Sequence, residues 1–205
     1  MNITIFGATG RVGNEILQRA LEDGHLVRVL VRTPSKLTPH ENLTILEGDI
    51  REQQSVSEAI KGADAVFSAI GTDKTTTLTD AIPLIIEAMQ KEEIKRIVTI
   101  GTAGILQSRT NPEAYRFQST ESKRRLTFAA EEHAKAYEQL AATNLEWTVV
   151  CPTYLPDGKA TGQWRTKRNF LPEDGVEISV GDTAEFAYKE LLDPQFINVR
   201  VGLAY

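Results

Sequence analysis

The chain lacks three features that would each point to a particular cellular setting. It has a single cysteine, Cys151, in 205 residues, so no disulfide can form within the chain and we expect a reducing compartment, the cytoplasm. No apolar run is long enough to cross a bilayer, and a strand pattern begins at Ile3, which leaves no room for a signal peptide. A chain of this length is expected to form one domain, residues 1–205, as a monomer or a small homo-oligomer.

Basic charge is scarce as well. The chain has 23 Lys and Arg residues against 28 Asp and Glu residues, a formal net charge of −5, and no basic stripe. This balance argues against nucleic acid or an acidic membrane surface as the main partner. The short run Lys123-Arg124-Arg125 is followed by Glu131-Glu132 and is interpreted as a solvated helix face.

Glycine is concentrated in one informative place, Gly7-Ala8-Thr9-Gly10-Arg11-Val12-Gly13. The stretch follows a strand pattern and opens a helix pattern, which is the context in which such a motif binds a dinucleotide. Gly7 allows a tight turn, Gly10 a close approach of the backbone to a pyrophosphate, and Gly13 close packing of the helix on the strand. The free amides and the dipole at the helix start would then face the phosphates. The alternative is an ordinary glycine-rich turn between a strand and a helix.

The residues after the second strand, 26–31, bear on which dinucleotide is bound. A site for NAD usually has an acidic residue near this point, to bind the ribose hydroxyls. The chain instead has Arg32-Thr33-Pro34-Ser35-Lys36, and Arg11 adds a third cation from the glycine-rich stretch. Three such cations would pair with a 2′-phosphate, so we predict NADP(H) rather than NAD(H). The alternative is that these are exposed loop charges that bind nothing in particular.

Apolar runs alternate with helical patterns along the whole chain, which predicts a doubly wound, mostly parallel α/β sheet, the Rossmann fold. The expected strands are 3–6, 26–31, 43–47, 65–69, 96–100, 146–151 and 199–203. The later helices are expected near 80–89, with Asp80 as N-cap, at about 121–143, and from Asp182, with Glu185 completing a capping-box-like pair.

Ligands bind beyond the carboxyl ends of the strands in such sheets, which selects further cofactor residues. Asp49, in Gly48-Asp49-Ile50, could accept a hydrogen bond from the adenine amino group, and could equally cap its own turn. The small residues of Ser68-Ala69-Ile70-Gly71 would let the second half of the cofactor lie across the fourth strand. Thr102, Pro152 and Thr153, after the fifth and sixth strands, complete the expected cofactor contacts.

A long segment from Thr153 to Gly175 follows the sixth strand and is rich in glycine and proline. Long loops inside a compact domain are usually functional or disordered, so we predict a loop that covers the substrate. Tyr154 and Trp164 are its candidate substrate contacts, although Trp164 could simply anchor the loop. Cys151 is interpreted as a small buried residue rather than a nucleophile.

With these residues in place, the chain resembles the atypical short-chain dehydrogenases of the NAD(P)-binding, NmrA-like type. Within that group it is most similar to biliverdin reductase B, to flavin reductases and to bacterial NADH-flavin reductases. The resemblance rests on the glycine-rich stretch, Arg32, Gly48-Asp49, Ser68-Ala69-Ile70-Gly71 and Ile178-Ser179-Val180-Gly181-Asp182-Thr183-Ala184. The family implies an NAD(P)H-dependent oxidoreductase.

The chain departs from most short-chain dehydrogenases in its acid–base residues. Those enzymes use a Tyr-x-x-x-Lys pair, in which the lysine lowers the pKa of the tyrosine. At what look like the corresponding positions, this chain has Ala130 in place of the tyrosine and Ala134 in place of the lysine. Tyr137 does not restore the pair, because the residue four positions later is Ala141. The resemblance therefore implies direct hydride transfer to a stacked planar acceptor, such as a flavin or a quinone.

The resemblance also suggests two catalytic candidates. Thr102 matches a family serine or threonine that could bind the nicotinamide amide or the substrate, or could only cap its strand. His133 matches a helix histidine of biliverdin reductase B that could orient substrate or relay a proton, and an exposed helix histidine is an equal alternative. Biliverdin reductase B has an arginine where this chain has Asp73-Lys74, which argues against bilin reduction.

Three functional hypotheses remain open at this point. The first is an NADPH-dependent reductase of planar small-molecule acceptors. The second is a non-catalytic NADP(H) sensor that binds another protein, and it is suggested by the missing Tyr-Lys pair. A third, weaker hypothesis is an isomerase or epimerase with bound cofactor. No metal site is predicted.

Overall fold

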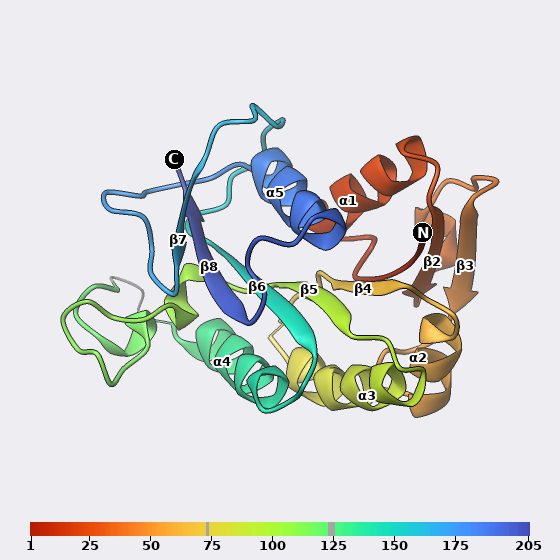
Figure 1. The fold of residues 1–205 in the computed structure, drawn as a ribbon, viewed down its shortest axis with the longest axis horizontal. Helices are drawn as coiled ribbons and strands as arrows, with labels where there is room; N and C mark the ends of the chain where they lie inside the picture. Colours follow the sequence, from red (N-terminus) through yellow and green to blue (C-terminus); the bar gives the residue numbers. More distant parts are fainter. Residues whose placement is uncertain (73, 123–125) are drawn as a thin grey trace.

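In the computed structural model the chain forms one eight-stranded sheet with helices on both faces (Figure 1). The structure describes residues 1–72, 74–122 and 126–205, so Asp73 and the Lys123-Arg124-Arg125 run lie outside the described residues. The strands are β1 (Asn2–Phe6), β2 (Leu26–Val31), β3 (Leu43–Glu47), β4 (Ala65–Ser68), β5 (Arg96–Ile100), β6 (Glu146–Pro152), β7 (Arg165–Arg168) and β8 (Val199–Ala204). Their order in the sheet is β3-β2-β1-β4-β5-β6-β8-β7, which confirms the predicted doubly wound fold.

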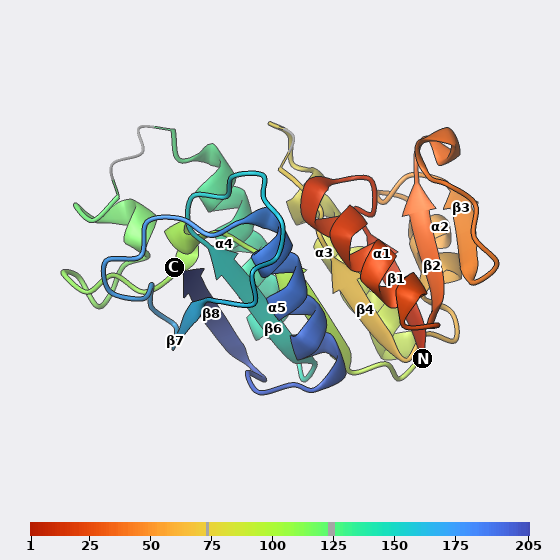
Figure 2. The ribbon, with the colours of Figure 1, turned by 90° about the horizontal axis from the view of Figure 1, so that it is seen from above.

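Helices cover both faces of this sheet, which explains why its inner strands, such as β4 and β8, are buried along their whole length. The α-helices of the described residues are α1 (Arg11–Glu22), α2 (Gln53–Ile60), α3 (Thr77–Lys91), α4 (Phe128–Ala141) and α5 (Val180–Leu192). Short 3-10 turns lie at η1 (Pro34–Lys36), η2 (Ala103–Ile105) and η3 (Arg116–Gln118). Figures 1 and 2 show α1 and α5 side by side on one face and α2, α3 and α4 on the other.

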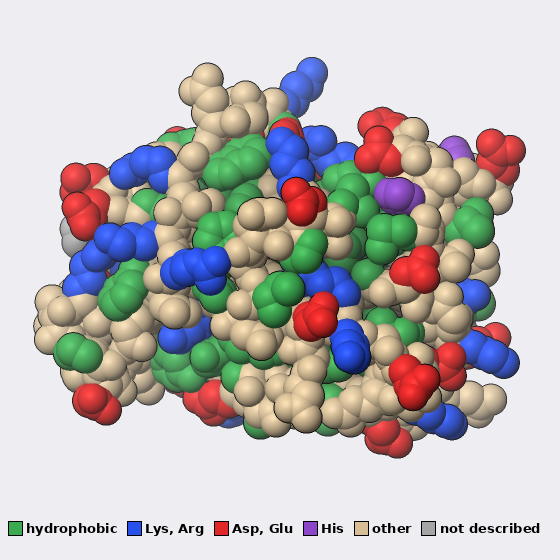
Figure 3. Space-filling model, viewed as in Figure 1, with side chains coloured by type: hydrophobic (Ala, Val, Ile, Leu, Met, Phe, Trp, Pro, Cys, Tyr) green, Lys and Arg blue, Asp and Glu red, His purple; other side chains and the backbone are tan. Residues whose placement is uncertain are grey.

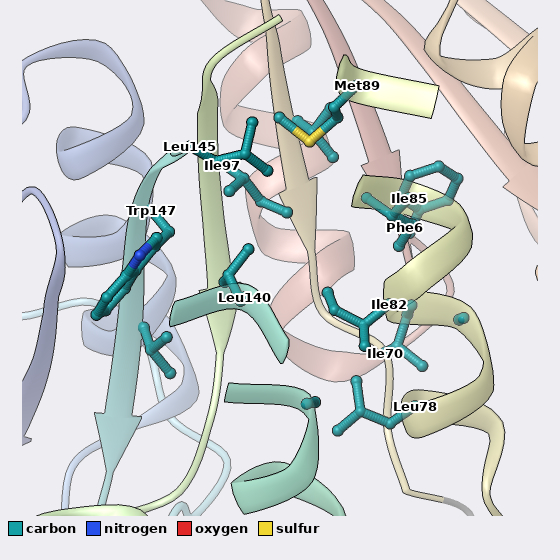
Figure 4. Close-up of a cluster of buried hydrophobic side chains, with 14 of the residues drawn as sticks. Phe6, Ile70, Leu78, Ile82, Ile85, Met89, Ile97, Leu140, Leu145 and Trp147 are labelled. Atoms are coloured by element: carbon teal, nitrogen blue, oxygen red, sulfur yellow. The ribbon is translucent and has the colours of Figure 1, made fainter. Parts of the chain in front are cut away.

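Alternate side chains of each strand enter one of two buried clusters. In β1, Ile3 and Ile5 join the cluster under α1 and α5, whereas Phe6 joins the cluster under α2, α3 and α4. Figure 4 shows side chains of α3, among them Ile82 and Ile85, pointing toward this second cluster. Full burial of each such side chain contributes about 1.5–3 kcal/mol, so the two layers fix where the strand ends lie.

The segment predicted as a substrate-covering loop, Thr153 to Gly175, is organised differently from the prediction. It contains β7, which pairs antiparallel with β8 at the edge of the sheet. The sequence of this strand, Arg165-Thr166-Lys167-Arg168, has no apolar residue, so nothing in it signals a strand. Charged side chains are typical of sheet edges, where they discourage pairing with another molecule.

Several helix ends also differ from the predictions. α3 begins at Thr77 rather than at Asp80, and Asp80 in its first turn accepts a hydrogen bond from Thr76. α4 is shorter than the predicted helix 121–143. The N-cap of α5 is Ser179, whose hydroxyl accepts a hydrogen bond from the amide of Asp182 at 3.0 Å. Asp182 therefore does not begin the helix, and its carboxylate is free to bind elsewhere.

The surface mixes charges of both signs. Figure 3 shows acidic and basic side chains interspersed over one face, with apolar side chains between them. None of the helices in residues 1–72, 74–122 and 126–205 is both long enough and apolar enough to cross a membrane.

Candidate functional site: a dinucleotide cradle and a neighbouring hollow

The turn between β1 and α1 is shaped by two glycines that no other residue could replace without strain. Gly7 has a φ of +79°, and a Cβ there would overlap the carbonyl oxygen of Ala69 at the end of β4. A Cβ on Gly13 would overlap the carbonyl oxygen of Gly7. The start of α1 therefore lies directly against the ends of β1 and β4, as the glycine spacing predicts.

The N-terminus of α1 is open to a ligand. Its N-cap is Gly10, which has no side chain to cap the helix, and its first turn contains no acidic residue. The first intrahelical bond of the helix runs from the amide of Asn14 to the carbonyl of Gly10 at 2.9 Å. The amides of the first turn and the helix dipole thus face outward uncapped, an arrangement that fits the pyrophosphate of a dinucleotide.

A pocket of about 210 Å³ lies beside this turn, and most of the predicted adenosine-side residues line it. Its lining residues are Gly7, Thr9, Gly10, Leu30, Val31, Arg32, Gly48, Asp49, Ile50, Arg51, Ala69, Ile70, Gly71 and Thr77. Val12 is buried in the core, so only its backbone faces the turn. Ser68 is fully buried, and its hydroxyl has no partner among the described residues.

Two polar residues of this pocket have clear structural partners. Asp49 accepts a hydrogen bond from the amide of Arg51 at 2.9 Å, so it does cap its turn, and this leaves its second oxygen available. Arg51 donates to Thr75 at 3.0 Å and to Thr77, and it lies 3.4 Å from Asp80. The sequence analysis did not identify Arg51. Its position just after the carboxyl end of β3, two residues beyond Asp49, could have indicated that it lines the pocket.

The three cations predicted to meet a 2′-phosphate do not form one cluster. Arg32 lines the adenosine-side pocket and has no hydrogen-bond or ion-pair partner in the part of the chain that the structure describes. Arg11 and Lys36 instead line an adjoining open trough, which shares Thr9 and Gly10 with that pocket. Arg11 donates hydrogen bonds to the carbonyl of Leu155 at 2.9 Å and to the carboxylate of Asp157 at 2.8 Å. The side chain of Arg11 is thus directed toward the segment after β6, and a joint contact of the three cations with a 2′-phosphate stays a prediction.

A larger hollow, of about 440 Å³, lies beyond the end of β5. Thr102, Thr153 and Tyr154, three of the predicted site residues, line it together. Its other lining residues come from later segments: Ala103, Gly104, Arg116, Phe117, Glu121, Ser122, Leu126, Thr127, Ala129, Ala130, Gly175 and Val176. Only the two ends of the Thr153–Gly175 segment, with Val176 next to it, reach this hollow, since its middle part forms the sheet edge.

The space in this hollow depends on two very small residues. A Cβ on Gly104 would lie 3.1 Å from the Cβ of Ala130, so the two backbones face each other closely. Ala130 stands at the position that resembles the tyrosine of ordinary short-chain dehydrogenases, and Ala134 at the lysine position is buried. Position 130 therefore supplies no phenol, and the phenol among the described lining residues of the hollow is that of Tyr154.

Glu121 organises the far wall of the hollow. Its carboxylate accepts hydrogen bonds from the hydroxyl of Ser108 and the amide of Arg109, both at 2.6 Å, and lies 3.9 Å from Arg116. Although its partial burial opposes ionisation, these bonds hold the pKa of Glu121 below its ordinary value. No sequence signal identified Glu121 or Arg116, because both lie in a polar segment without periodicity.

The second predicted catalytic residue, His133, lies apart from Thr102. It lines a very small cavity beneath β5, among Leu78, Ile82 and Tyr137. Burial lowers the pKa of His133 to about 4, with the neighbouring Glu132 opposing the shift, so the ring is uncharged at neutral pH. The structure does not bring the two predicted catalytic residues into one hollow.

Trp164 and Cys151 take structural positions. The indole of Trp164 packs edge-on against Phe186 at 6.0 Å, and the ammonium of Lys189 lies 5.0 Å from its ring centre. These contacts anchor the segment of Trp164 to α5, which is the second of the two roles that the sequence allowed. Burial raises the pKa of the Cys151 thiol to about 12, which fits a small core residue rather than a nucleophile.

Comparisons with known proteins agree with this geometry. A family model described as NAD(P)H-binding matches residues 7–194. The YwnB protein of Bacillus subtilis (strain 168) is 30% identical over 208 residues, which cover 98% of this chain and 96% of YwnB. A Streptococcus pneumoniae protein provisionally named an NADH-flavin reductase is 23% identical, with a TM-score of 0.85 over 100% of this chain and 99% of its own. The Escherichia coli O157:H7 protein ChuY, named as an anaerobilin reductase, is 22% identical, with a TM-score of 0.83 over 100% and 97%. At these identities the two structures show a shared fold.

Proposed function

Because the chain belongs to the NAD(P)H-binding family of oxidoreductases, we propose that it is an NADPH-preferring reductase that transfers a hydride to a planar acceptor, such as a flavin or a quinone. The dinucleotide would lie across the glycine-rich turn, with its adenosine in the pocket beside Arg32 and Asp49. Its nicotinamide would lie toward Thr102, and the acceptor would occupy the hollow beyond.

The observation that carries the proposal is the hollow next to Thr102, which is lined by Ala130 where a tyrosine would otherwise stand. The nicotinamide, when bound, supplies the hydride, so the protein is left to position two rings and to exclude water. Ala130 and Gly104 add little bulk to the wall of the hollow, which would leave its volume to a flat acceptor, and Thr102 and Thr153 offer hydroxyls to the polar edge of that acceptor. His133 and Trp164 have no part in this arrangement, since neither lines the hollow.

The preference for NADPH rests on Arg32. It lines the adenosine-side pocket beside the end of β2, where an acidic residue would bind the ribose hydroxyls of NAD, and it has no competing partner among the described residues. A free guanidinium at that point can pair with a 2′-phosphate through two hydrogen bonds. The names of the Streptococcus pneumoniae and Escherichia coli proteins, both reductases, support a reductase here.

The test is the loss of NADPH absorbance under anaerobic conditions, with FMN, FAD and a simple quinone offered in turn and NADH run in parallel. We expect turnover with at least one acceptor and much less of it with NADH. Saturable binding of NADPH without oxidation by any acceptor would contradict the reductase proposal.

A second candidate function is a non-catalytic NADP(H) sensor. Ala130 and Ala134 favour it, because the chain has no acid–base pair of the ordinary kind at these positions. The sensor predicts affinities that differ between NADP⁺ and NADPH, or a protein partner whose binding depends on the cofactor. Equal affinities together with measurable turnover would exclude it.

A further inference from the structure

Arg11 connects the start of α1 to residues 155–157, in the segment that follows β6. We propose that Arg11 and Asp157 form a clasp that holds residues 155–160 over the bound dinucleotide and slows its release, whether or not the cofactor carries a 2′-phosphate. The proposal rests on the cofactor site proposed above, and makes no use of the acceptor.

One side of the clasp is fixed by the glycine-rich turn. Arg11 is the first residue of α1, directly after the uncapped Gly10 where the pyrophosphate is expected to lie. Its guanidinium donates to Leu155 and Asp157, and lines the trough rather than the pocket that holds Arg32. Arg11 is therefore placed to act on the segment after β6 rather than on the 2′-phosphate.

Residues 155–160, which carry Asp157, are bound to the start of α5. The amides of Val180 and Gly181 donate to the carbonyls of Pro156 at 3.0 Å and Gly158 at 2.9 Å. A Cβ on Gly181 would overlap the backbone at Ala160, so the segment lies directly against the start of the helix. The first amides of α5 are thus used by the chain itself.

Asp182 fixes the end of the same segment. Its carboxylate accepts hydrogen bonds from the amides of Thr161 at 2.7 Å and Gly162 at 2.9 Å, and from the hydroxyl of Tyr205 at 2.5 Å. Although burial opposes its ionisation, these bonds hold the pKa of Asp182 below its ordinary value, so the anchor stays charged at neutral pH. Residues 155–160 are therefore held against α5, which packs beside α1, and the bonds from Arg11 attach the start of this segment to the first residue of α1 as well.

The clasp also connects the cofactor to the neighbouring hollow. Thr153 and Tyr154, which line the hollow, run directly into the segment that Arg11 holds. The two side chains of the clasp are largely exposed, 57% for Arg11 and 83% for Asp157. Exposed ion pairs contribute little to folding stability, so the effect of this one is expected on the release of the cofactor rather than on the fold.

The experiment measures dissociation rates of NADPH and of NADH by displacement, followed by nicotinamide fluorescence, and does not require turnover. We expect Asp157→Asn and Arg11→Gln each to accelerate release of both cofactors by about two- to fivefold, the range for an exposed ion pair. The double variant should release them no faster than Arg11→Gln alone, because the two residues act as one unit. The matched control for Asp157→Asn is Glu15→Gln, which also removes a negative charge from the wall of the trough. It should leave the dissociation rates of NADPH and NADH within about 1.5-fold of those of the unmodified protein, the effect of a screened surface charge.

Four outcomes would overturn the proposal. Slower release from Asp157→Asn would mean that Asp157 competes with the cofactor for Arg11. An effect of Arg11→Gln confined to NADPH would mean that Arg11 binds the 2′-phosphate. An equal effect of Glu15→Gln would mean that any negative charge in the trough slows release, and not the specific contact between Arg11 and Asp157. Unchanged rates in Asp157→Asn would mean that Asp157 has no part in retaining the cofactor. Absence of any NAD(P)H binding by the unmodified protein would instead overturn the cofactor site itself, and absence of acceptor turnover would leave these rates measurable.

Discussion

The pocket beside the glycine-rich turn, where we place the cofactor, and the hollow beyond β5, where we place the acceptor, are built in different ways. The pocket is formed mainly by short segments at the ends of β1, β2, β3 and β4, and four of its lining residues are glycines, which expose backbone. The described lining of the hollow comes from residues 102–104, 116–117, 121–122, 126–127, 129–130, 153–154 and 175–176, and it includes the side chains of Arg116, Phe117 and Glu121. A site made of backbone requires glycines at fixed spacing, whereas a site made of distant side chains has no local spacing to show.

The largest effect that this comparison predicts is at Gly7. Gly7→Ala introduces a positive-φ alanine whose Cβ overlaps Ala69, and we expect it to lower the free energy of unfolding by about 3–5 kcal/mol and to abolish cofactor binding. The matched control is Gly62→Ala, which has a similar φ of +71° but open space, and should cost about 1–2 kcal/mol. Urea unfolding measures both. Equal losses in the two variants would show that the close approach to β4 is not essential.

The next effect concerns His133, which lines neither the hollow nor the pocket but a small cavity beneath β5. Its pKa is about 4 in the folded chain and 6.5 in the unfolded chain, so only the unfolded chain binds its proton between these values. Stability should therefore be fully present above pH 6.5 and fall by about 2–3 kcal/mol as the pH drops to 4. Urea unfolding at several pH values, compared with His133→Gln, isolates this contribution. An identical pH dependence in the variant would contradict it.

A third effect, on the cofactor pocket alone, is expected at Arg32. Arg32→Gln should weaken NADPH binding by about ten- to fiftyfold, the loss of a charge-assisted bond at an exposed site, and leave NADH binding nearly unchanged. Equilibrium titration of both cofactors measures it. Lys91→Gln, in the last turn of α3, is the control for a general change of charge. A parallel loss of NADH affinity would indicate that Arg32 contacts a part shared by both cofactors.

The same difference between the two regions explains what the sequence could predict. The glycine spacing, the missing acidic residue after β2 and Asp49 all lie in local contexts whose geometry the fold dictates, and the structure brings Gly7, Arg32 and Asp49 to one pocket. The bonds of Arg11 to the segment after β6 could not be predicted, because the direction of a long side chain depends here on Asp157, which is 146 residues away in the chain.

The acceptor side was predicted less completely for a related reason. Thr102, Thr153 and Tyr154 follow strand ends and were found, whereas Glu121 and Arg116 were not, because their positions depend on how a polar segment folds back over α4. Trp164 shows the opposite error: an aromatic residue in a long segment suggested a substrate contact, but its partners Phe186 and Lys189 belong to α5. The edge strand β7 was missed because charged residues carry no strand pattern.

The smallest of the expected effects tests whether the hollow serves the acceptor and not the cofactor. Ala130→Phe should place a ring in the hollow that Ala130 lines and lower kcat/KM for the acceptor by about tenfold, because an acceptor displaced by about 1 Å loses its alignment for transfer. The affinity for NADPH should stay within about twofold, since the reacting ring and not the binding pocket is displaced. Ala141→Phe, at the exposed last residue of α4, adds the same side chain outside the hollow and should change neither quantity. A loss of NADPH affinity in Ala130→Phe would assign the hollow to the cofactor. Unchanged turnover would mean that the acceptor binds elsewhere, and the hollow beyond β5 would then not be the acceptor site.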